Sequence, residues 1–192
     1  MPNPLLTRIA TQTFAVLLLS SAHLASADQM PDSIHELVPT LQQWGREPTL
    51  VSAVQQSNAS GQTLAQIQQI NSEWQQTSGI SPFMHHLMQN RAAKRMLALE
   101  RSAPYFLELF LMNNLGANVA MTNKTSDYWQ GDEAKFTASY HDGVGQVHIG
   151  DVQFDDSSQA YLIQVSVPVM DGERAIGALT IGINLDEYEP DH

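Results

Sequence analysis

The spacing of apolar residues changes near the middle of the chain. In the first half, residues such as Leu64, Ile67 and Ile70 recur every three or four positions, the pattern of an amphipathic helix. After Pro104 the apolar residues form short runs between clusters of Asn, Asp and Gly, which is typical of strands and turns. The pattern predicts helices over 34–45, 48–58, 64–79, 82–102 and 134–140. It predicts strands over 106–112, 118–121, 147–154, 160–170 and 175–184.

Helix-start signals support these boundaries. Ser33 and Glu36 have the spacing of a capping box, in which each side chain bonds to the backbone of the other residue. Thr63 and Gln66 have the same spacing. Proline is favoured in the first turn of a helix, because its missing N–H would have no partner there, and the helices expected from 48 and 82 both begin with proline.

The order of these elements indicates the fold class. The long helices come first and the strands follow, which predicts an α+β domain. N-terminal helices (helical part 33–102) should pack on one face of a five-stranded antiparallel sheet (sheet part 105–186). The segment 122–146 should partly cover the other face. Strand alternation places His148 on one face with Gly150 and Val152.

The N-terminus has the features of a targeting peptide. Arg8 precedes an apolar stretch, and Ala25-Ser26-Ala27 matches the small-x-small cleavage pattern. Polar residues interrupt the stretch, so it falls short of the roughly 20 apolar residues of a spanning helix. We therefore predict a signal peptide over 1–27, cleavage after Ala27, and a single periplasmic domain over 28–192 with no membrane span. The alternative is an uncleaved membrane anchor.

Composition excludes several functions. The chain carries 9 Lys and Arg residues against 20 Asp and Glu residues, a formal net charge of −11. That balance argues against nucleic-acid binding, which needs clustered cations. There is no cysteine, so disulfides and thiol chemistry are excluded. The usual nucleotide-binding, hydrolase and zinc-protease motifs are missing, and we expect no enzymatic activity.

Two groups of residues are candidates for ligand binding. Asp127, Tyr128, Trp129 and Asp132 place aromatic rings beside carboxylates, which suits a cationic or amphipathic ligand. The alternative is that Trp129 fills the core and that the carboxylates favour the start of the next helix. The second group could hold a carboxylate ligand or satisfy buried polar groups. Its members are Lys135, Tyr140, His148, Gln164 and Ser166.

Two simpler interpretations limit these assignments. His148 could be an ordinary surface or hydrogen-bonded histidine. His85 and His86 are adjacent on a predicted helix and point about 100° apart, so they are poor co-ligands of one metal. We therefore expect no metal and no cofactor.

The second half resembles a known family. The stretches that carry the resemblance are 110–119 (FLMNNLGANV), 125–133 (TSDYWQGDE), 164–169 (QVSVPV), Asp171-Gly172 and 176–184 (IGALTIGIN). They are similar to the extracytoplasmic PAS-like sensor modules called Cache or PDC domains, over roughly 50–186. The resemblance implies a fold in which small metabolites bind in a cup between the sheet and the loop that follows its first hairpin.

The resemblance also carries functional expectations. Most such modules are tethered to a kinase, a chemoreceptor or a cyclase, whereas this chain ends eight residues after Asn184, like the stand-alone periplasmic PDC sensor proteins. Amino-acid-binding members carry an Arg before the aromatic pair and an Asp in the last strand. Ser126 and Asp127 stand before the pair here, and the Asp position falls on Gly182. A free α-amino acid is therefore not the favoured ligand.

These observations give two hypotheses. The first is a soluble periplasmic single-Cache sensor module that binds a small metabolite, an amine or a carboxylate, and signals through a separate membrane-bound partner. The alternative is a ligand-free PAS-like interaction protein that docks a membrane signalling or envelope complex. The two differ in whether the cup is open or filled by Trp129, Phe136 and Tyr140.

Overall fold

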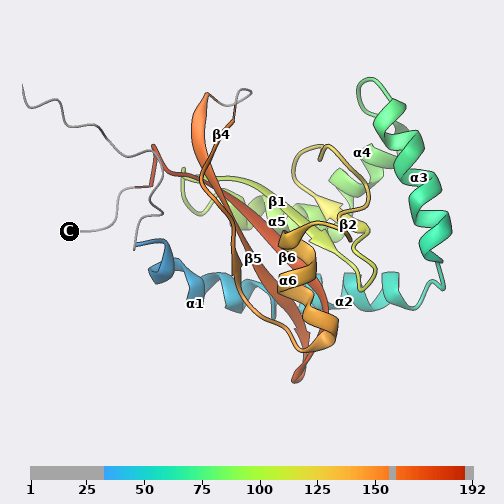
Figure 1. Ribbon diagram of the computed structural model, residues 1–192, viewed down its shortest axis with the longest axis horizontal. Helices are drawn as coiled ribbons and strands as arrows, with labels where there is room; N and C mark the ends of the chain where they lie inside the picture. The colour runs from blue at the N-terminus through green and yellow to red at the C-terminus, as the bar shows by residue number, and fades with distance from the viewer. Residues whose placement is uncertain (1–32, 156–158, 189–192) are drawn as a thin grey trace, which may run out of the picture.

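The computed structural model describes residues 33–155 and 159–188 (Figure 1). The predicted signal peptide, 1–27, lies outside the described residues. Within these residues, five helices precede the first strand, and one more helix follows the first hairpin. The helices are α1 (Ile34–Trp44), α2 (Pro48–Asn58), α3 (Leu64–Gln76), α4 (Pro82–Gln89), α5 (Arg91–Glu100) and α6 (Ala134–Tyr140), followed by a short 3-10 turn η1 (His141–Gly143). The strands are β1 (Phe106–Met112), β2 (Asn118–Met121), β3 (His148–Ile149), β4 (Gln153–Asp155), β5 (Ala160–Asp171) and β6 (Arg174–Asn184).

The strands form one antiparallel sheet. Their order is β2-β1-β6-β5-β3, and β4 also pairs with β5. The long strands β5 and β6 form a hairpin whose turn contains Gly172 at a φ of 61°, a conformation that glycine adopts without strain. The α+β prediction is confirmed.

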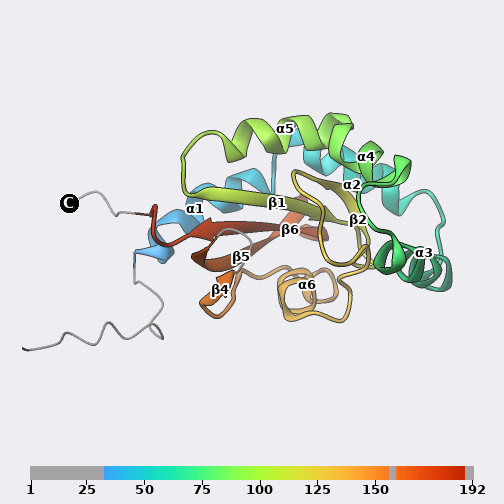
Figure 2. The same cartoon turned by 90° about the horizontal axis from the view of Figure 1, so that it is seen from above.

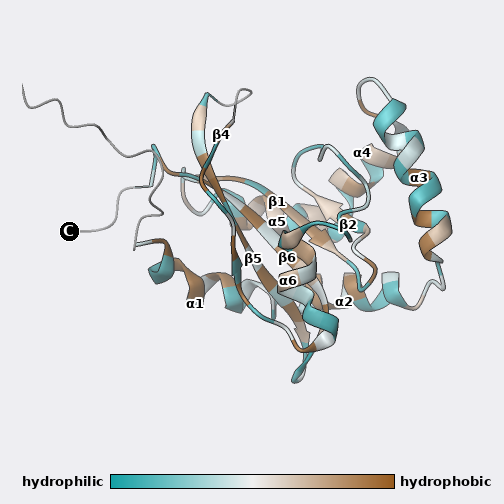
Figure 3. Cartoon of the chain, viewed as in Figure 1, coloured by the Kyte–Doolittle hydropathy of each residue, from teal (hydrophilic) through white to brown (hydrophobic). Residues whose placement is uncertain are grey.

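One face of the sheet packs against the N-terminal helices. Alternate residues of β5, such as Ile163, Val165 and Val167, are fully buried and meet apolar side chains of α1, α2 and α5. β1 and β6 contribute the alternating residues Leu109, Leu111, Leu179, Ile181 and Ile183 to this first core. Figure 2 shows α5 on one side of the strands and α6 on the other, and Figure 3 shows that β5 and β6 are mostly hydrophobic.

The opposite face of the sheet has a second core, smaller and at one end. Phe110 and Met112 of β1 contact Phe136 of α6 and apolar residues of the segment between β2 and α6. Helix α3 closes this core from outside with Ile67 and Trp74. The rest of α3 is mostly hydrophilic, and the helix lies at the end of the molecule away from α1 (Figures 1 and 3).

The helix predicted over 82–102 is in fact two helices. The helix is interrupted at Asn90, whose backbone is extended with a ψ of 174°. The side-chain oxygen of Asn90 accepts a hydrogen bond from the N–H of Ala93, and its amide donates to the carbonyl of Val119 on β2. Asparagine is a favoured N-cap, and here the cap also ties the new helix to the sheet. Apolar periodicity continues across the break, which explains why the sequence pattern did not reveal it.

The two predicted capping boxes have different outcomes. Thr63 and Gln66 form the box, with both reciprocal hydrogen bonds. The box at Ser33 is wrong, because the Ser33 side chain caps nothing and its backbone is already helical at φ −60° and ψ −25°. The helix expected to reach Gly79 ends at Gln76, and Gly79 follows it at a φ of 79°.

The edge strand predicted over 147–154 is interrupted by a bulge. Ile149 pairs with Val165, and Gln153 pairs with Leu162, so four steps along the edge match three along β5. One residue is therefore inserted in the edge strand, which re-aims the side chains around it. The expectation that His148 and Val152 share a face is wrong for this reason: Val152 packs against the first core, whereas His148 lies on the other side.

Candidate functional site

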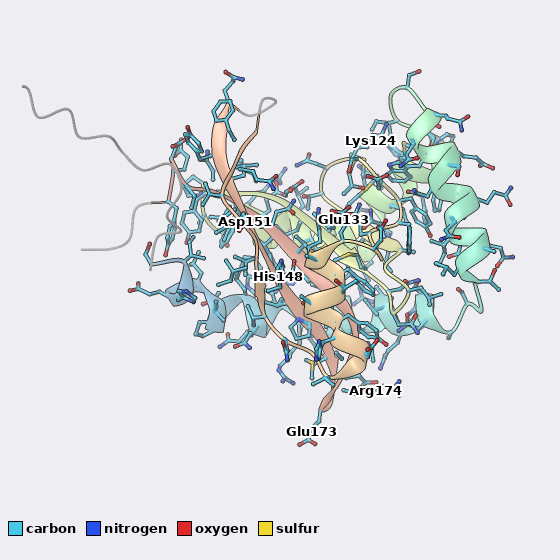
Figure 4. The ribbon with its side chains drawn as sticks, in the orientation of Figure 1. Lys124, Glu133, His148, Asp151, Glu173 and Arg174 are labelled. Carbon is cyan, nitrogen blue, oxygen red and sulfur yellow. The ribbon has the colours of Figure 1, made fainter. Side chains whose placement is uncertain are left out.

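A cleft of about 370 Å³ lies on the sheet face opposite the N-terminal helices. Strands β1 and β5 form its floor. The first turn of α6 forms one wall, and the edge strand with its bulge forms the other. Figure 4 shows Glu133, His148 and Asp151 around this region. The cleft is lined by Glu108, Glu133, Ala134, Lys135, His148, Ile149, Gly150, Asp151, Gln153, Phe154, Leu162 and Gln164.

The floor is built around a hydrogen bond that crosses a glycine. Glu108 of β1 and Gln164 of β5 both pair with Gly182 of the strand between them. Because Gly182 has no side chain, the two outer side chains meet above it, and Gln164 Nε2 donates to Glu108 Oε1 at 2.9 Å. A Cβ atom at position 182 would lie 2.5 Å from Glu108 Cγ, so this arrangement requires glycine. The side chains of Glu108 and Gln164 therefore cover position 182.

The wall formed by α6 carries an ion pair. Lys135 Nζ lies 3.0 Å from Glu133 Oε2 and 5.4 Å from the centre of the Phe110 ring. The Lys135 side chain is only 19% exposed. The lysine is therefore already held by a carboxylate and an aromatic face, which reduces the charge that it can offer to a ligand.

The wall formed by the edge strand depends on the bulge. It places His148 before the inserted residue and Gln153 after it on the same cleft, although five positions separate them and a regular strand would point them to opposite faces. Asp151 lies within the bulge and is exposed. Phe154 at the rim is 50% exposed, and its ring packs edge-on against Tyr161 at 5.3 Å.

The charges of the lining are unequal. Three carboxylates, those of Glu108, Glu133 and Asp151, face one ammonium group, that of Lys135. A cleft with low-dielectric walls strengthens the field of such charges. The arrangement can hold a positively charged group through charge-assisted hydrogen bonds and can contact apolar atoms through Leu162 and Phe154.

A buried carboxyl group lies near the floor. Glu100 ends α5, and its Oε2 is buried without a hydrogen-bond partner among the described residues. Burial raises the pKa of Glu100, a hydrogen bond with Thr122 and the charge of Arg101 lower it in part, and the charge of Glu108 raises it further. The negative charge of Glu108 therefore extends its effect beyond the cleft.

The aromatic pair lies away from the cleft, in and against the second core, and the half-buried Asp127 precedes it. Tyr128 is 4% exposed, and the N–H groups of Tyr128 and Trp129 both donate to Asn71 Oδ1 of α3, at 2.8 and 3.0 Å. Trp129 Nε1 donates to the carbonyl of Leu115 at 2.8 Å, and Asp127 accepts a hydrogen bond from Gln75 of α3. Burial raises the pKa of the Tyr128 hydroxyl. These contacts attach α3 to the loop.

The other predicted residues divide between the cleft and the packing around it. Lys135, His148 and Gln164 line the cleft. Ser166 is fully buried, and its hydroxyl lies 2.8 Å from that of Thr180, also fully buried. Tyr140 stacks on Phe136 at 5.3 Å, and Asp132 is exposed. A ligand-binding role stays a prediction for all nine residues: Lys135, His148 and Gln164 in the cleft, and Asp127, Tyr128, Trp129, Asp132, Tyr140 and Ser166 outside it.

Sequence reasoning missed three acidic residues of the lining. Glu108 interrupts an otherwise apolar strand, and a lone charge in a central strand was a usable signal. Glu133 and Asp151 gave no such signal, because carboxylates at a helix start or in a loop are common. Their place in the cleft depends on tertiary packing and on the bulge.

Two kinds of feature are absent from the described part of the chain. Within residues 33–155 and 159–188, no three His, Asp or Glu side chains are grouped so that they could hold a metal ion. In the same residues, every helix is too short or too polar to cross a lipid bilayer.

Comparisons with known proteins return structures only. No protein-family model matches the chain, and a search of the curated proteins finds no match. Among solved structures, the chain is similar to the sensor domain of the V. cholerae histidine kinase DctB, with 17% identity and a TM-score of 0.38, covering 81% of this chain and 53% of that one.

Two chemoreceptor domains are also similar. The ligand-binding domain of the Pseudomonas aeruginosa PAO1 amino-acid chemoreceptor PctC, in complex with GABA, is 9% identical with a TM-score of 0.36, covering 80% of this chain and 62% of that one. The sensory domain of the Campylobacter jejuni chemoreceptor Tlp3 is 13% identical with a TM-score of 0.37, covering 79% and 62%. The chain spans between about half and three fifths of the length of these structures.

Proposed function

We propose that the protein is a Cache-type sensor module that binds a small metabolite in the cleft and passes the signal to a separate membrane-bound partner. The observation that carries the proposal is the Glu108–Gln164 hydrogen bond over Gly182, at the floor of an open cleft. A fixed polar pair in a concave site is the arrangement that orients a small ligand.

The composition of the lining supports binding. Ligand pockets combine apolar walls with a few convergent polar groups, and their usual volumes begin near ~300 Å³. The cleft has that combination: Leu162 and Phe154 supply apolar surface, and the carboxylates, His148 and Gln164 supply polar groups.

The alternative hypothesis required a filled cup. Phe136 is buried, and Trp129 and Tyr140 pack against it, so the end of the sheet face near β2 is filled. The end near β3 holds the cleft. The open half supports the sensor hypothesis over the ligand-free interaction protein.

Hydrogen bonds offer a route from the cleft to the N-terminal helices. Strand β5 forms part of the cleft floor, and near its other end Met170 N–H donates to the carbonyl of Gly45 at 2.9 Å. The side chain of Asn58, at the end of α2, donates to the carbonyl of Ile176 on β6 at 2.8 Å. A ligand that favoured one position of β5 and β6 would thus favour one position of α1 and α2, and a partner could recognise that position.

The proposed location is the periplasm. The support is the signal-peptide pattern of residues 1–27 and the acidic charge of the chain. Both come from sequence, and the partner is proposed as membrane-bound because the module must pass its signal across a membrane.

A thermal-shift screen tests the proposal. The protein is measured with amines, amino acids and short carboxylates, since a ligand that binds only the folded state must raise the Tm as its concentration passes Kd. We expect a saturable shift that is reduced in Gln164→Ala, which removes the fixed polar pair, and kept in Gln89→Ala, the same change at the exposed end of α4. A shift that both variants retain would place the ligand elsewhere, and no shift with any compound would favour the interaction protein.

A further inference from the structure

We infer that the ligand of the cleft is an aliphatic amine that carries no carboxylate group. This inference rests on the proposed function and names the chemical class of its ligand. It follows from which charges of the lining already have partners and which do not.

The lining contains more carboxylate groups than its one ammonium group can neutralise. Glu133 is paired with Lys135 at 3.0 Å. Asp151 forms no ion pair with a described residue, and Glu108 accepts one hydrogen bond from the neutral amide of Gln164. Two negative charges therefore remain uncompensated around one cleft, and an ammonium group is the simplest partner for them.

Glu108 is prepared to accept such a group. Its Oε1 is held by Gln164 Nε2, which fixes the carboxylate across Gly182. No described residue donates a hydrogen bond to its Oε2, so one oxygen of an oriented carboxylate stays available. A carboxylate that is already ordered loses little conformational entropy when it binds, which favours affinity.

A carboxylate ligand would find few cations. The only Lys or Arg in the lining is Lys135, which is bound to Glu133 and lies over the Phe110 ring. Recruiting Lys135 would break its ion pair with Glu133, and a third acid would remain without a cation. His148 is the other candidate hydrogen-bond donor of the lining. An anionic ligand would therefore meet net repulsion in the cleft, and the carboxylate of a zwitterion would offset the attraction of its ammonium group.

The apolar part of the lining suits methylene groups. Phe154 stands at the rim with half of its surface exposed, and Leu162 lies on the floor. A short alkyl chain can cover these side chains while its ammonium group reaches Glu108. A second ammonium group could reach Asp151 on the bulge, so a diamine should bind more tightly than a monoamine.

The test uses four probes with one carbon skeleton. Butylamine, 1,4-diaminobutane, 4-aminobutanoate and butanoate differ in charge but little in size, and each is titrated into the protein by isothermal titration calorimetry. We expect 1,4-diaminobutane to bind most tightly and butylamine next. The zwitterion should bind at least about tenfold more weakly than butylamine, and butanoate should give no heat of binding.

Variants separate the cleft from the general acidity of the chain. Glu108→Gln should weaken 1,4-diaminobutane about ten- to one-hundredfold, the effect of losing a charge-assisted contact, and Asp151→Asn should weaken it less. Glu173→Gln removes the same charge from the exposed tip of the β5–β6 hairpin, far from the cleft (Figure 4), and should leave the affinity unchanged. Because Asp151 is exposed, its variant keeps the test valid even if Glu108→Gln lowers stability.

The outcomes distinguish the two proposals. Tighter binding of 4-aminobutanoate or butanoate, lost in His148→Ala, would overturn the amine assignment and keep the ligand-binding function. Equal weakening by Glu108→Gln and Glu173→Gln would show non-specific attraction to an acidic surface and would also overturn the assignment. Failure of the four probes and of the wider screen would overturn both.

Discussion

A buried pair of hydroxyl groups in the β5–β6 hairpin allows a prediction that separates a packing role from a ligand-binding role. Ser166 on β5 and Thr180 on β6 are paired residues of the hairpin, both are fully buried, and their oxygens lie 2.8 Å apart. Each hydroxyl has the other as its partner. We therefore expect the substitutions Ser166→Ala and Thr180→Val to be strongly coupled.

The magnitudes follow from what each substitution leaves behind. Ser166→Ala leaves the Thr180 hydroxyl buried without a partner, which costs about 1–3 kcal/mol of unfolding free energy, and Thr180→Val leaves the Ser166 hydroxyl in the same state. The double variant removes both hydroxyls and leaves no unpaired polar group, so it should cost less than the sum of the two. We expect a coupling energy of about 1–2 kcal/mol.

Urea denaturation of the four proteins, followed by far-UV circular dichroism, measures these free energies. Comparison within the cycle cancels the different strand propensities of Ser and Ala, which could otherwise contribute up to about 1 kcal/mol. Additive effects, within about 0.5 kcal/mol, would refute the pairing of the hydroxyls. If 1,4-diaminobutane lost affinity in Ser166→Ala without a loss of stability, Ser166 would instead belong to the ligand site.

Three other predictions concern packing and charge elsewhere in the fold. Asn71→Ala should destabilise the protein by about 1–3 kcal/mol, because two backbone N–H groups of the loop lose their acceptor, whereas Asn71→Asp keeps an acceptor and should cost less in the same denaturation assay. Gly177→Ala should cost about 1–3 kcal/mol or more and lower the Tm, because its Cβ would lie 2.2 Å from the backbone oxygen of Met112 and the backbone would have to move. Glu100→Gln should raise stability at neutral pH. Since the pKa of Glu100 is raised in the folded protein, the stability that this group contributes to the wild type is complete in acid and is lost as pH rises through the folded pKa. The unfolding free energies of wild type and variant, measured between about pH 4 and about pH 8, should therefore converge in acid and separate at higher pH. A difference that does not change with pH would contradict the raised pKa of Glu100.

Much of the fold could be predicted because its determinants are local. The capping box at Thr63, the prolines that begin α2 and α4, and the alternation of apolar residues along β5 each depend on neighbours in sequence. The errors arose where a tertiary contact decides. The extended conformation of Asn90 is stabilised by a hydrogen bond to Val119 on β2, a partner that the apolar periodicity of 82–102 does not specify.

The candidate site was predicted only in part, for a related reason. Lys135, His148 and Gln164 were singled out by residue type, and they line the cleft. Asp151 could not be placed from sequence, because the number of residues between two strand pairings decides which way it faces. The aromatic pair was predicted as a ligand site because of its residue types. In the structure, the backbone N–H groups of both residues donate to Asn71 of α3, a long-range contact that the local sequence does not specify.

The bulge in the edge strand makes the cleft adjustable by length as well as by residue type. Deleting one residue between Ile149 and Gln153 would bring the two halves of the edge into a single register with β5, and it would change the direction of the side chains between them. The first core would be little affected, because Val152 is the one residue of 150–152 that packs against it. A single-codon deletion there could thus change the preference of the cleft in one evolutionary step, and the same position is where an engineer would begin to redirect it.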